Sequence, residues 1–519
     1  MAEKLIGQNY IPVDHVAKVT GRARYAEDFR VDGMLFTKLL LSPMPHARVR
    51  SIDSAAALAM PGVKAILTAD DLPDLGGEER ALTNEPLYAG EPILAVAAVD
   101  ELTAAEAIER IIVDLEPLPF VTDSLDTLRP DGPNARLEGN AWGPPEPGGE
   151  SALQTVKWAP EDFVDEASGR LPMGRALEEW AFGDLDAGFA EAALVLDETF
   201  VTQSTCHHPM ETRSAMAYWQ NGKLFLHGST QSVARTQGNI ARWVGIDLAQ
   251  VVLISEYTGG GFGSKGGGAV SMTIPALLSK KANAPVMMRI SREEESYIGR
   301  ARTNMTGRAR VGFAKDGRIT ALDLFIVQDT GATSALGDHR SAGLAASLIY
   351  QPPAMRWRAI NVLTNTPPRN QQRSPGPMQA NGIIEPVITK AAKQLGIDQV
   401  VIRRLNSPEG KALFGPAGPD GERRHVTSAF VKQGFDRGAA LFRWDERKAR
   451  AGQRQGSKVR GVGVAVGPHG AGSVGFDSIM TIRPDGKLYV QSGVGNLGTH
   501  SVMDLARVAA ELLDMPWQK

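Results

Sequence analysis

The chain has 519 residues, of which 43% are hydrophobic and 22% charged, the balance of a folded globular protein. Because single hydrophobic cores stop growing at about 250 to 300 residues, two or three domains are expected. The net charge of -3 and the lack of a long Lys/Arg block argue against nucleic acid as a partner. The start of the chain has no apolar signal region and no 18-residue apolar run occurs, so we expect a cytoplasmic protein without a membrane span.

A single cysteine, Cys206, excludes an intrachain disulfide and an iron–sulfur cluster, since a cluster needs about four cysteine ligands. Any such cluster must lie on another chain. His207 and His208 follow Cys206, which suggests a metal site. Adjacent residues of an extended segment point to opposite faces, however, and a zinc site needs about four convergent ligands, so an ordinary strand or loop is favoured.

Near the N-terminus, strand-like apolar runs occur at 34–43 and 92–100, and Thr103 fits a capping box for a helix at 104–111. A strand-like run at 111–121 then completes one βαβ-like step.

Strand and helix patterns alternate through the middle of the chain, which indicates an α+β fold. Gly396 is a helix stop signal, and Asp398 is a cap for the next helix. We expect strands at 222–231, 250–260 and 285–291, and helices at 272–282, 382–396, 397–406 and 504–519. Pro- and Gly-rich or polar breaks interrupt the pattern at 129–149, 415–425 and 447–460.

A glycine-rich loop, TGGGFGSKGGG at 258–268, lies between a strand-like and a helix-like run. Gly261, Gly263 and Gly266 formally match the dinucleotide-binding pattern G-x-G-x-x-G in its required context. The acidic residues after the next strand lie past the expected offset of about 20 residues, and the residue before Lys265 is serine, which rules out a P-loop. Glycines permit close approach of the backbone to an anionic cofactor, but a tight structural turn explains them equally well.

Two further polar constellations stand near turns. The loop 365–386 presents Arg369 and Arg373 before a helix, and arginine suits bidentate contacts to oxyanions. The second, Ser-Thr-Gln at 229–231, ends a strand, where its side chains meet a ligand or cap the helix that follows. Taken alone, each constellation more often has a structural role than a ligand-binding one.

In this order, the three constellations resemble the molybdopterin-binding subunit of the xanthine dehydrogenase and aldehyde oxidase family, the molybdenum hydroxylases. The similarity runs over essentially the whole chain, and its motifs are HHPMETRSAMAYW, STQ, GGGFGSK, RSPGPMQ and GIIEPVITKAAKQLGIDQVVIRRLN. It implies an α+β fold with these units: an α/β hammerhead domain (1–128), a Pro/Gly-rich linker (129–175), a first molybdopterin-binding domain (176–414), a polar connection (415–460) and the start of a second such domain (461–519).

The resemblance also implies roles for cofactor-binding residues. Gln231 would approach the apical oxygen of the molybdenum, and Gly261, Phe262 and Gly263 would pack their backbone against the metal centre. Arg373 would lie near the cofactor from the other side. No protein group would ligate the metal directly.

Several positions depart from the purine-oxidising members of the family. Gly266 stands where they carry a substrate-binding Glu, and Pro375 stands where they carry a stacking Phe. Arg340 falls close to a substrate arginine of the family, with a spacing to Tyr350 that differs by one residue. The family's glycine-rich pterin-binding motif near the second domain corresponds to 493–501, with Leu497 where Gln is usual.

The resemblance implies an oxidoreductase subunit that hydroxylates or oxidises a small organic substrate with oxygen from water. The cofactor would be molybdenum-molybdopterin, with the cytosine dinucleotide form as one option, and iron–sulfur and FAD centres would lie on partner subunits. The family's general-base Glu belongs to a motif beyond Lys519, so the catalytic residue is unknown, and a separate chain would supply it or the chain is truncated. Alternatives are a molybdenum-dependent hydratase or alcohol dehydrogenase, an NAD-binding dehydrogenase, and a non-catalytic assembly subunit.

Overall fold

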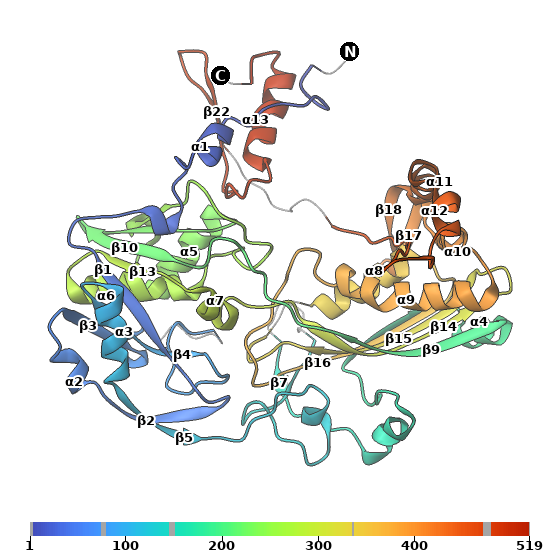
Figure 1. The fold of residues 1–519 in the computed structure, drawn as a ribbon, viewed down its shortest axis with the longest axis horizontal. Coiled ribbons are helices and arrows are strands. Elements are labelled where there is room, and N and C mark those ends of the chain that lie inside the picture. The colour runs from blue at the N-terminus through green and yellow to red at the C-terminus, as the bar shows by residue number, and fades with distance from the viewer. Residues whose placement is uncertain (1–3, 74–78, 145–150, 335–336, 471–478, 518–519) are drawn as a thin grey trace.

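The computed structural model of the chain describes residues 4–73, 79–144, 151–334, 337–470 and 479–517. Two lobes lie side by side, and each is built on a seven-stranded sheet (Figure 1). This mixture of helices and sheets confirms the predicted α+β class. Part of the predicted linker (129–175), residues 145–150, lies outside the described residues.

The first sheet joins strands from two distant parts of the chain, in the order β12-β11-β10-β13-β1-β4-β3. Strand β1 pairs in parallel with β13, with Leu35 opposite Val286. The predicted hammerhead and first cofactor-binding units therefore share one sheet. Its strands are β1 (Leu35–Leu41), β3 (Val63–Thr68), β4 (Pro92–Ala98), β10 (Ala215–Gln220), β11 (Lys223–Gly228), β12 (Val251–Ile254) and β13 (Val286–Met288).

Two details of the predicted βαβ-like step are wrong. The helix begins earlier, because Asp100 rather than Thr103 caps it by accepting a hydrogen bond from Thr103 N at 2.7 Å. The strand after it does not return to the sheet of β4, since β5 pairs antiparallel with β2 in a separate two-stranded sheet. The elements of this lobe outside the main sheet are β2 (Ala47–Asp53), β5 (Ile112–Pro117), α2 (Ala55–Leu58), α3 (Glu101–Glu109), α5 (Val233–Val244), α6 (Thr273–Ala282) and α7 (Arg292–Ile298).

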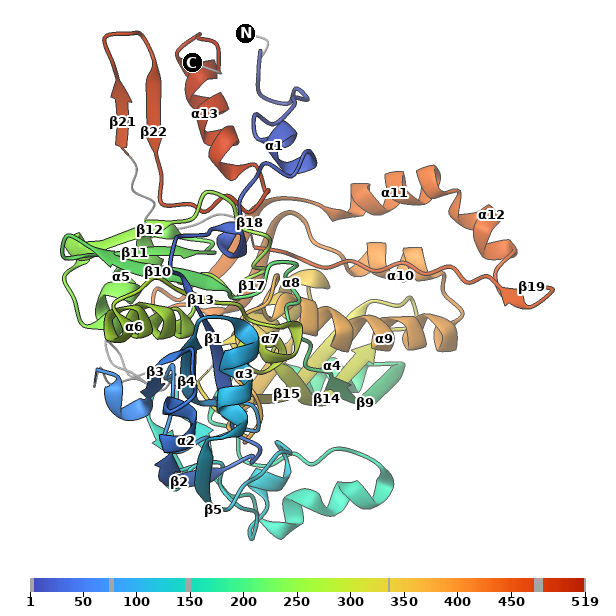
Figure 2. The ribbon, with the colours of Figure 1, turned by 60° about the vertical axis from the view of Figure 1, so that its left-hand side comes forward.

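The second sheet has the order β7-β6-β16-β15-β14-β9, with β8 paired to β16. Helices α8 and α9 cover one of its faces (Figure 2), where alternate residues such as Leu324 and Trp357 pack against Ile383. The elements of this lobe are β6 (Ala141–Trp142), β7 (Leu153–Gln154), β8 (Glu178–Phe182), α4 (Leu185–Glu191), β9 (Leu194–Thr202), β14 (Asn304–Phe313), β15 (Ile319–Asp329), α8 (Asp338–Ile349), β16 (Met355–Val362), α9 (Pro377–Leu395) and α10 (Gln399–Asn406).

The predicted break at 415–425 is wrong in part, because it lies within a hairpin of β17 and β18. The register shifts between Phe414 and Ala417, and such a bulge tolerates the Gly and Pro between them. The remaining elements are β17 (Glu409–Ala417), β18 (Arg423–Phe430), α11 (Val431–Phe442), α12 (Trp444–Ala449), β19 (Arg454–Gln455), β20 (Lys458–Val459), β21 (Ile479–Ile482), β22 (Leu488–Gln491), α13 (Ser501–Leu512) and α1 (His15–Val19).

The first and last parts of the described chain pack together above the lobes (Figure 1). Tyr10 donates to Asp504 at 2.8 Å, and Arg507 donates to Gln8 O at 3.0 Å. Among the described residues, no helix combines the length and the apolar character that crossing a membrane requires.

Candidate functional site

The site begins at the carboxyl ends of two neighbouring parallel strands. In β11 and β12, Leu226 lies opposite Leu253, so the segments 229–231 and 258–268 leave the same edge of the sheet. Ligands of open α/β sheets commonly bind outside such strand ends. The loop between β16 and α9 reaches this edge from the second lobe, because Arg373 N donates to Phe262 O at 2.7 Å. The structure thus brings together the three constellations that the sequence suggested.

The glycine-rich loop holds the side chain of Gln231. Its Oε1 accepts hydrogen bonds from Gly263 N at 2.8 Å and Lys265 N at 3.2 Å. Two N–H donors fix the oxygen at this end, so Nε2 lies at the other end, where no described residue accepts its hydrogens. A Cβ added to Gly261 would lie 2.4 Å from Gln231 Oε1, so packing requires glycine there.

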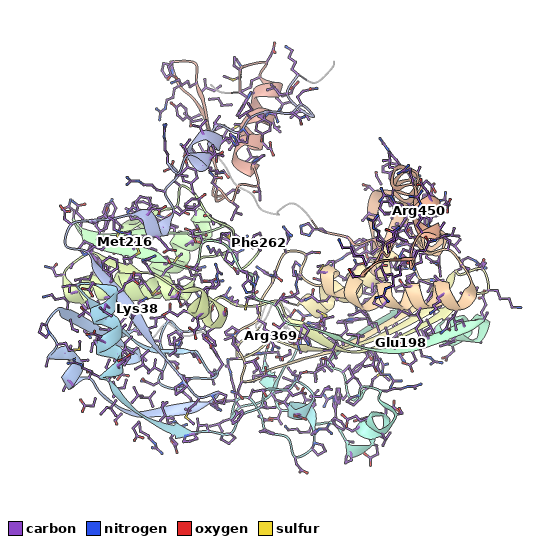
Figure 3. All side chains as sticks on the ribbon, viewed as in Figure 1. Lys38, Glu198, Met216, Phe262, Arg369 and Arg450 are labelled. Atoms are coloured by element: carbon purple, nitrogen blue, oxygen red, sulfur yellow. The ribbon has the colours of Figure 1, made fainter. Side chains whose placement is uncertain are left out.

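Phe262 lies at the tip of the loop, between the two lobes (Figure 3). Its backbone has a φ of 53°, an unusual value for a bulky residue, and its side chain is 40% exposed. The guanidinium carbon of Arg373 lies 5.7 Å from its ring centroid. Arg373 is exposed and forms no ion pair with any described residue, so its charge is available to a ligand beside Phe262.

The conformation of the 372–379 segment depends on Arg302, a residue that the sequence analysis missed. Arg302 is buried, and it donates to Gln372 Oε1 at 2.9 Å, to Arg373 O at 2.8 Å and to Gln379 Oε1 at 3.2 Å. One guanidinium therefore holds both ends of the loop that presents Arg373. No local sequence signal marks it, since it stands in an arginine-rich stretch far from the loop.

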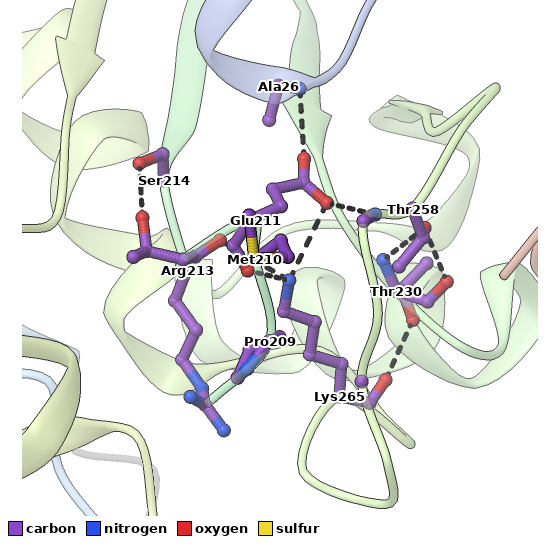
Figure 4. Close-up of polar contacts among 12 residues, drawn as sticks. Ala26, Pro209, Met210, Glu211, Arg213, Ser214, Thr230, Thr258 and Lys265 are labelled. Atoms are coloured by element: carbon purple, nitrogen blue, oxygen red, sulfur yellow. Dashed lines mark hydrogen bonds and ion pairs between the residues drawn. The ribbon is translucent and has the colours of Figure 1, made fainter. Parts of the chain in front are cut away.

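A buried ion pair between Lys265 and Glu211 supports the glycine-rich loop (Figure 4). Lys265 Nζ donates to Glu211 O at 2.7 Å and lies 3.6 Å from Glu211 Oε2. The carboxylate in turn accepts from Gly259 N at 2.7 Å and Ala26 N at 3.1 Å. Burial lowers the pKa of Lys265 to about 8. Lys265 is thus a scaffold residue. Sequence analysis missed this role because Glu211 stands 54 residues before Lys265 and no local pattern links the two.

The segment 493–496 completes the site from the C-terminal part of the chain. Gly495 N donates to Gln231 O at 2.9 Å, and Asn496 O accepts from Thr258 N at 3.0 Å. A Cβ on Gly495 would lie 2.2 Å from Thr230 O, so only glycine fits. The segment that the family resemblance associates with the pterin therefore lies directly against Gln231.

The dinucleotide reading of the loop conflicts with its hydrogen bonds. The N–H groups of Gly263 and Lys265, which would face a pyrophosphate, donate to Gln231 instead. Gly266 has room for a small side chain, because an added Cβ would make only ordinary van der Waals contacts, to Gly263 O at 3.5 Å and Gln371 Nε2 at 3.8 Å.

The other predicted substrate residues lie on or beside α8 and the Arg373 loop. Pro375 precedes Gly376, whose added Cβ would lie 2.5 Å from Asp338 O, so this loop packs on the start of α8. Arg340 lies two residues further along α8, where its guanidinium donates to Glu178 at 2.8 Å. Through this ion pair, Arg340 contacts β8 of the second sheet.

The Cys-His-His motif forms part of the wall behind the loop. His207 is buried between two backbone carbonyl groups, with Nε2 2.8 Å from Gln371 O and Nδ1 3.2 Å from Arg300 O. Burial lowers its pKa to about 4 and outweighs these carbonyl groups, which favour the cation. Within the described part of the chain, no three His, Cys, Asp or Glu side chains gather as a metal site would require.

Two family models match the chain. Residues 170–407 match the molybdopterin cofactor-binding domain, and residues 20–119 match the a/b hammerhead domain of aldehyde oxidase and xanthine dehydrogenase. The two matches correspond to the first molybdopterin-binding domain and the hammerhead domain that the resemblance implied. The first match contains Gln231, Phe262 and Arg373.

Curated relatives and solved structures agree with these matches. The chain is 27% identical over 529 residues to the xanthine dehydrogenase molybdenum-binding subunit of Escherichia coli O157:H7, covering 97% of this chain and 65% of that subunit. It is 29% identical over 414 residues to the nicotinate dehydrogenase large molybdopterin subunit of Eubacterium barkeri, covering 78% and 89%. The fold is similar to quinoline 2-oxidoreductase from Pseudomonas putida 86 (TM-score 0.76, 23% identity, 100% of this chain and 66% of that one) and to aldehyde oxidoreductase from Desulfovibrio gigas (TM-score 0.78, 22% identity, 98% and 55%).

Proposed function

Because the chain belongs to the xanthine dehydrogenase and aldehyde oxidase family, the molybdenum hydroxylases, we propose that it is the molybdenum-cofactor-binding subunit of an oxidoreductase. The enzyme would hydroxylate or oxidise a small organic substrate with oxygen derived from water. The chain spans 65% of the length of the xanthine dehydrogenase subunit it matches, so this activity is proposed for the assembled enzyme.

The observation that carries the proposal is the free amide nitrogen of Gln231. Two backbone N–H groups hold the amide oxygen, so Nε2 is a pre-oriented donor, and a Cβ at position 261 would displace the Gln231 side chain. A donor of this kind, together with the charge of Arg373, suits an anionic cofactor rich in oxygen atoms. The residues present therefore fit molybdenum-molybdopterin.

Each residue of the site would have a separate task in holding the cofactor. Gln231 would donate from Nε2 to an oxygen of the cofactor, and the backbone of Phe262 and Gly263 would pack against the metal centre. Arg373 would place positive charge on the opposite side. When bound, the cofactor supplies two-electron oxidation of the substrate, and the fixed donor lowers the cost of reorganisation around it.

The substrate lies outside the purine class in this proposal. The side at Gly266 is open, since an added Cβ there meets only ordinary contacts, and Pro375 offers no aromatic ring for stacking. A hydratase or alcohol dehydrogenase of the same family is a variant that these two positions also permit. Relatives are named for xanthine, nicotinate and nicotine, which are all nitrogen heterocycles.

Electrons would leave through iron–sulfur and FAD centres on partner subunits, because this chain has one cysteine, and a cluster needs about four. The general-base Glu that the resemblance implies would belong to the part of the relatives that this chain does not match. The cofactor form would be molybdopterin or its cytosine dinucleotide.

Metal and pterin analysis of the native complex, purified through this chain, tests the proposal. We expect about one molybdenum and one pterin per complex, and nucleotide analysis after acid release identifies the dinucleotide form. Reproducible absence of both would favour an assembly subunit. Titration of the purified chain with NADH is the second arm, because tight stoichiometric binding would favour the dinucleotide-binding alternative.

A further inference from the structure

A second site lies on the face of the second sheet that α8 and α9 leave open. A cavity of about 270 Å³ lies there. Along each strand, the residues that line it alternate with the residues that face the core under α8 and α9. Its floor is Phe325, which is 1% exposed. Its charged lining comes from four adjacent strands and consists of Asp197, Arg308, Arg310, Asp323, Arg356 and Arg358.

The strand register sets these side chains in two rows. In the first row, Arg310 lies opposite Asp323, which lies opposite Arg356. In the second row, Arg308 and Arg358 flank Phe325. The guanidinium carbon of Arg358 lies 5.3 Å from the Phe325 ring centroid. Four arginines thus converge on one aromatic floor.

The aspartates are already shared among these arginines. Asp323 accepts from Arg356 at 2.6 Å and from Arg358 at 3.2 Å, and Asp197 accepts from Arg308 at 2.6 Å. Four lining arginines against two lining aspartates give the lining a net charge of +2 (4 - 2), and Arg308 also pairs with Asp165 at 2.5 Å.

Two donors of the cavity lack partners within the described chain. Arg358 Nε is buried and makes no hydrogen bond. Arg310 forms no ion pair, and its guanidinium carbon rests 4.2 Å from the ring centroid of Phe189. A buried N–H without an acceptor costs stability. If these ion pairs served only to stabilise the sheet, the unpaired N–H of Arg358 would have no benefit.

We propose that this cavity binds a small organic anion that carries two or more oxyanionic groups, either carboxylate or phosphate. The planar fork of arginine matches both groups, and several forks converging on one cavity favour a ligand with several acceptors. A volume of 270 Å³ corresponds to about nine water molecules at roughly 30 Å³ each, which leaves room for a carbon skeleton between the anionic groups. The site is separate from the Gln231 site and does not depend on the function proposed above.

Isothermal titration of the purified chain at low ionic strength tests this inference, with citrate as the carboxylate probe and ribose 5-phosphate as the phosphate probe. We expect saturable binding of one molecule per chain for at least one probe, weakened by added salt. Arg310→Gln and Arg358→Gln should each weaken it at least tenfold. Arg437→Gln, an exposed arginine of α11 without an ion pair in the described chain, is the matched control and should bind like the parent chain.

Thermal unfolding separates a folding defect from a binding defect. Arg310 makes no internal ion pair, so Arg310→Gln should unfold at the same temperature as the parent chain and still lose binding. If neither probe binds saturably, or if the two cavity variants bind as tightly as Arg437→Gln, the inference is wrong.

Discussion

Gly263 N lies 2.8 Å from Gln231 Oε1, and this hydrogen bond determines which end of the Gln231 amide is free. Lys265 N reinforces it at 3.2 Å. Besides its own backbone contacts, the loop would therefore shape the proposed cofactor site by orienting a side chain that belongs to another strand end.

Gln231→Glu tests the role of the amide nitrogen alone. The carboxylate keeps an acceptor for Gly263 N and replaces the Nε2 donor by an oxygen. We expect turnover of the assembled enzyme to fall on the order of 100-fold, the scale seen when one pre-oriented donor is lost. The unfolding temperature should stay near that of the parent. Gln231→Ala should reduce turnover as well, with a small additional loss of stability from the two unpaired N–H groups. Equal losses of soluble protein and of turnover in both variants would point to a structural role.

Gly261→Ala and Gly266→Ala form a matched pair within one loop. The first places a Cβ 2.4 Å from Gln231 Oε1 and must displace that side chain, at a cost of about 1 to 3 kcal/mol. The second meets its nearest neighbours at 3.5 and 3.8 Å and should be tolerated. Molybdenum content of the purified complex should fall only for Gly261→Ala. Equal molybdenum content in the two variants would contradict the packing argument.

Phe262→Ala tests the placement of the loop tip beside the metal. The ring is 40% exposed, so its removal should leave the fold intact. The electron paramagnetic resonance signal of the molybdenum should change its shape or g values. Phe430→Ala removes another exposed ring, on β18, and should leave that signal unchanged. An unaltered signal with full activity in Phe262→Ala would remove Phe262 from the site.

His207 makes the stability of the chain depend on pH. Burial lowers its pKa from 6.5 to about 4, so between these values the unfolded chain binds a proton that the folded chain excludes. The free energy of unfolding is therefore unaffected by the titration of His207 above pH 6.5 and decreases as the pH falls toward 4. The lowering of the pKa from 6.5 to about 4 corresponds to about 3 to 4 kcal/mol, at roughly 1.4 kcal/mol per pH unit. Urea unfolding should show a shallower pH dependence for His207→Gln, whereas replacing exposed His425 in the same way should leave the slope unchanged.

Local signals predicted much of the fold. Helix α9 ends at Leu395 before Gly396, whose φ is 69°, and Asp398 caps α10 through Val400 N at 2.7 Å, both as the sequence indicated. The strands that lead into the site were also found, because apolar runs ending in glycine or in short polar residues are visible in a single sequence. The polar constellations themselves were found for the same reason.

The supports of the site could not be found in this way. Arg302, Glu211 and Lys265 are buried charges, and charged residues in a sequence are expected at the surface. The hydrogen-bond partners of these side chains lie between 48 and 185 residues away, and no local periodicity reports such separations. The pairing of β5 with β2, rather than with the sheet of β4, is non-local for the same reason.

The contact between Gly495 and Gln231 has a consequence for biosynthesis. During translation, the strand ends that carry Gln231 and the glycine-rich loop emerge long before 493–496. The nascent chain thus exposes these strand ends without the segment that packs against Gln231, and this contact forms only after 493–496 has left the ribosome. Cofactor loading would then follow the docking of 493–496 rather than the folding of the first sheet.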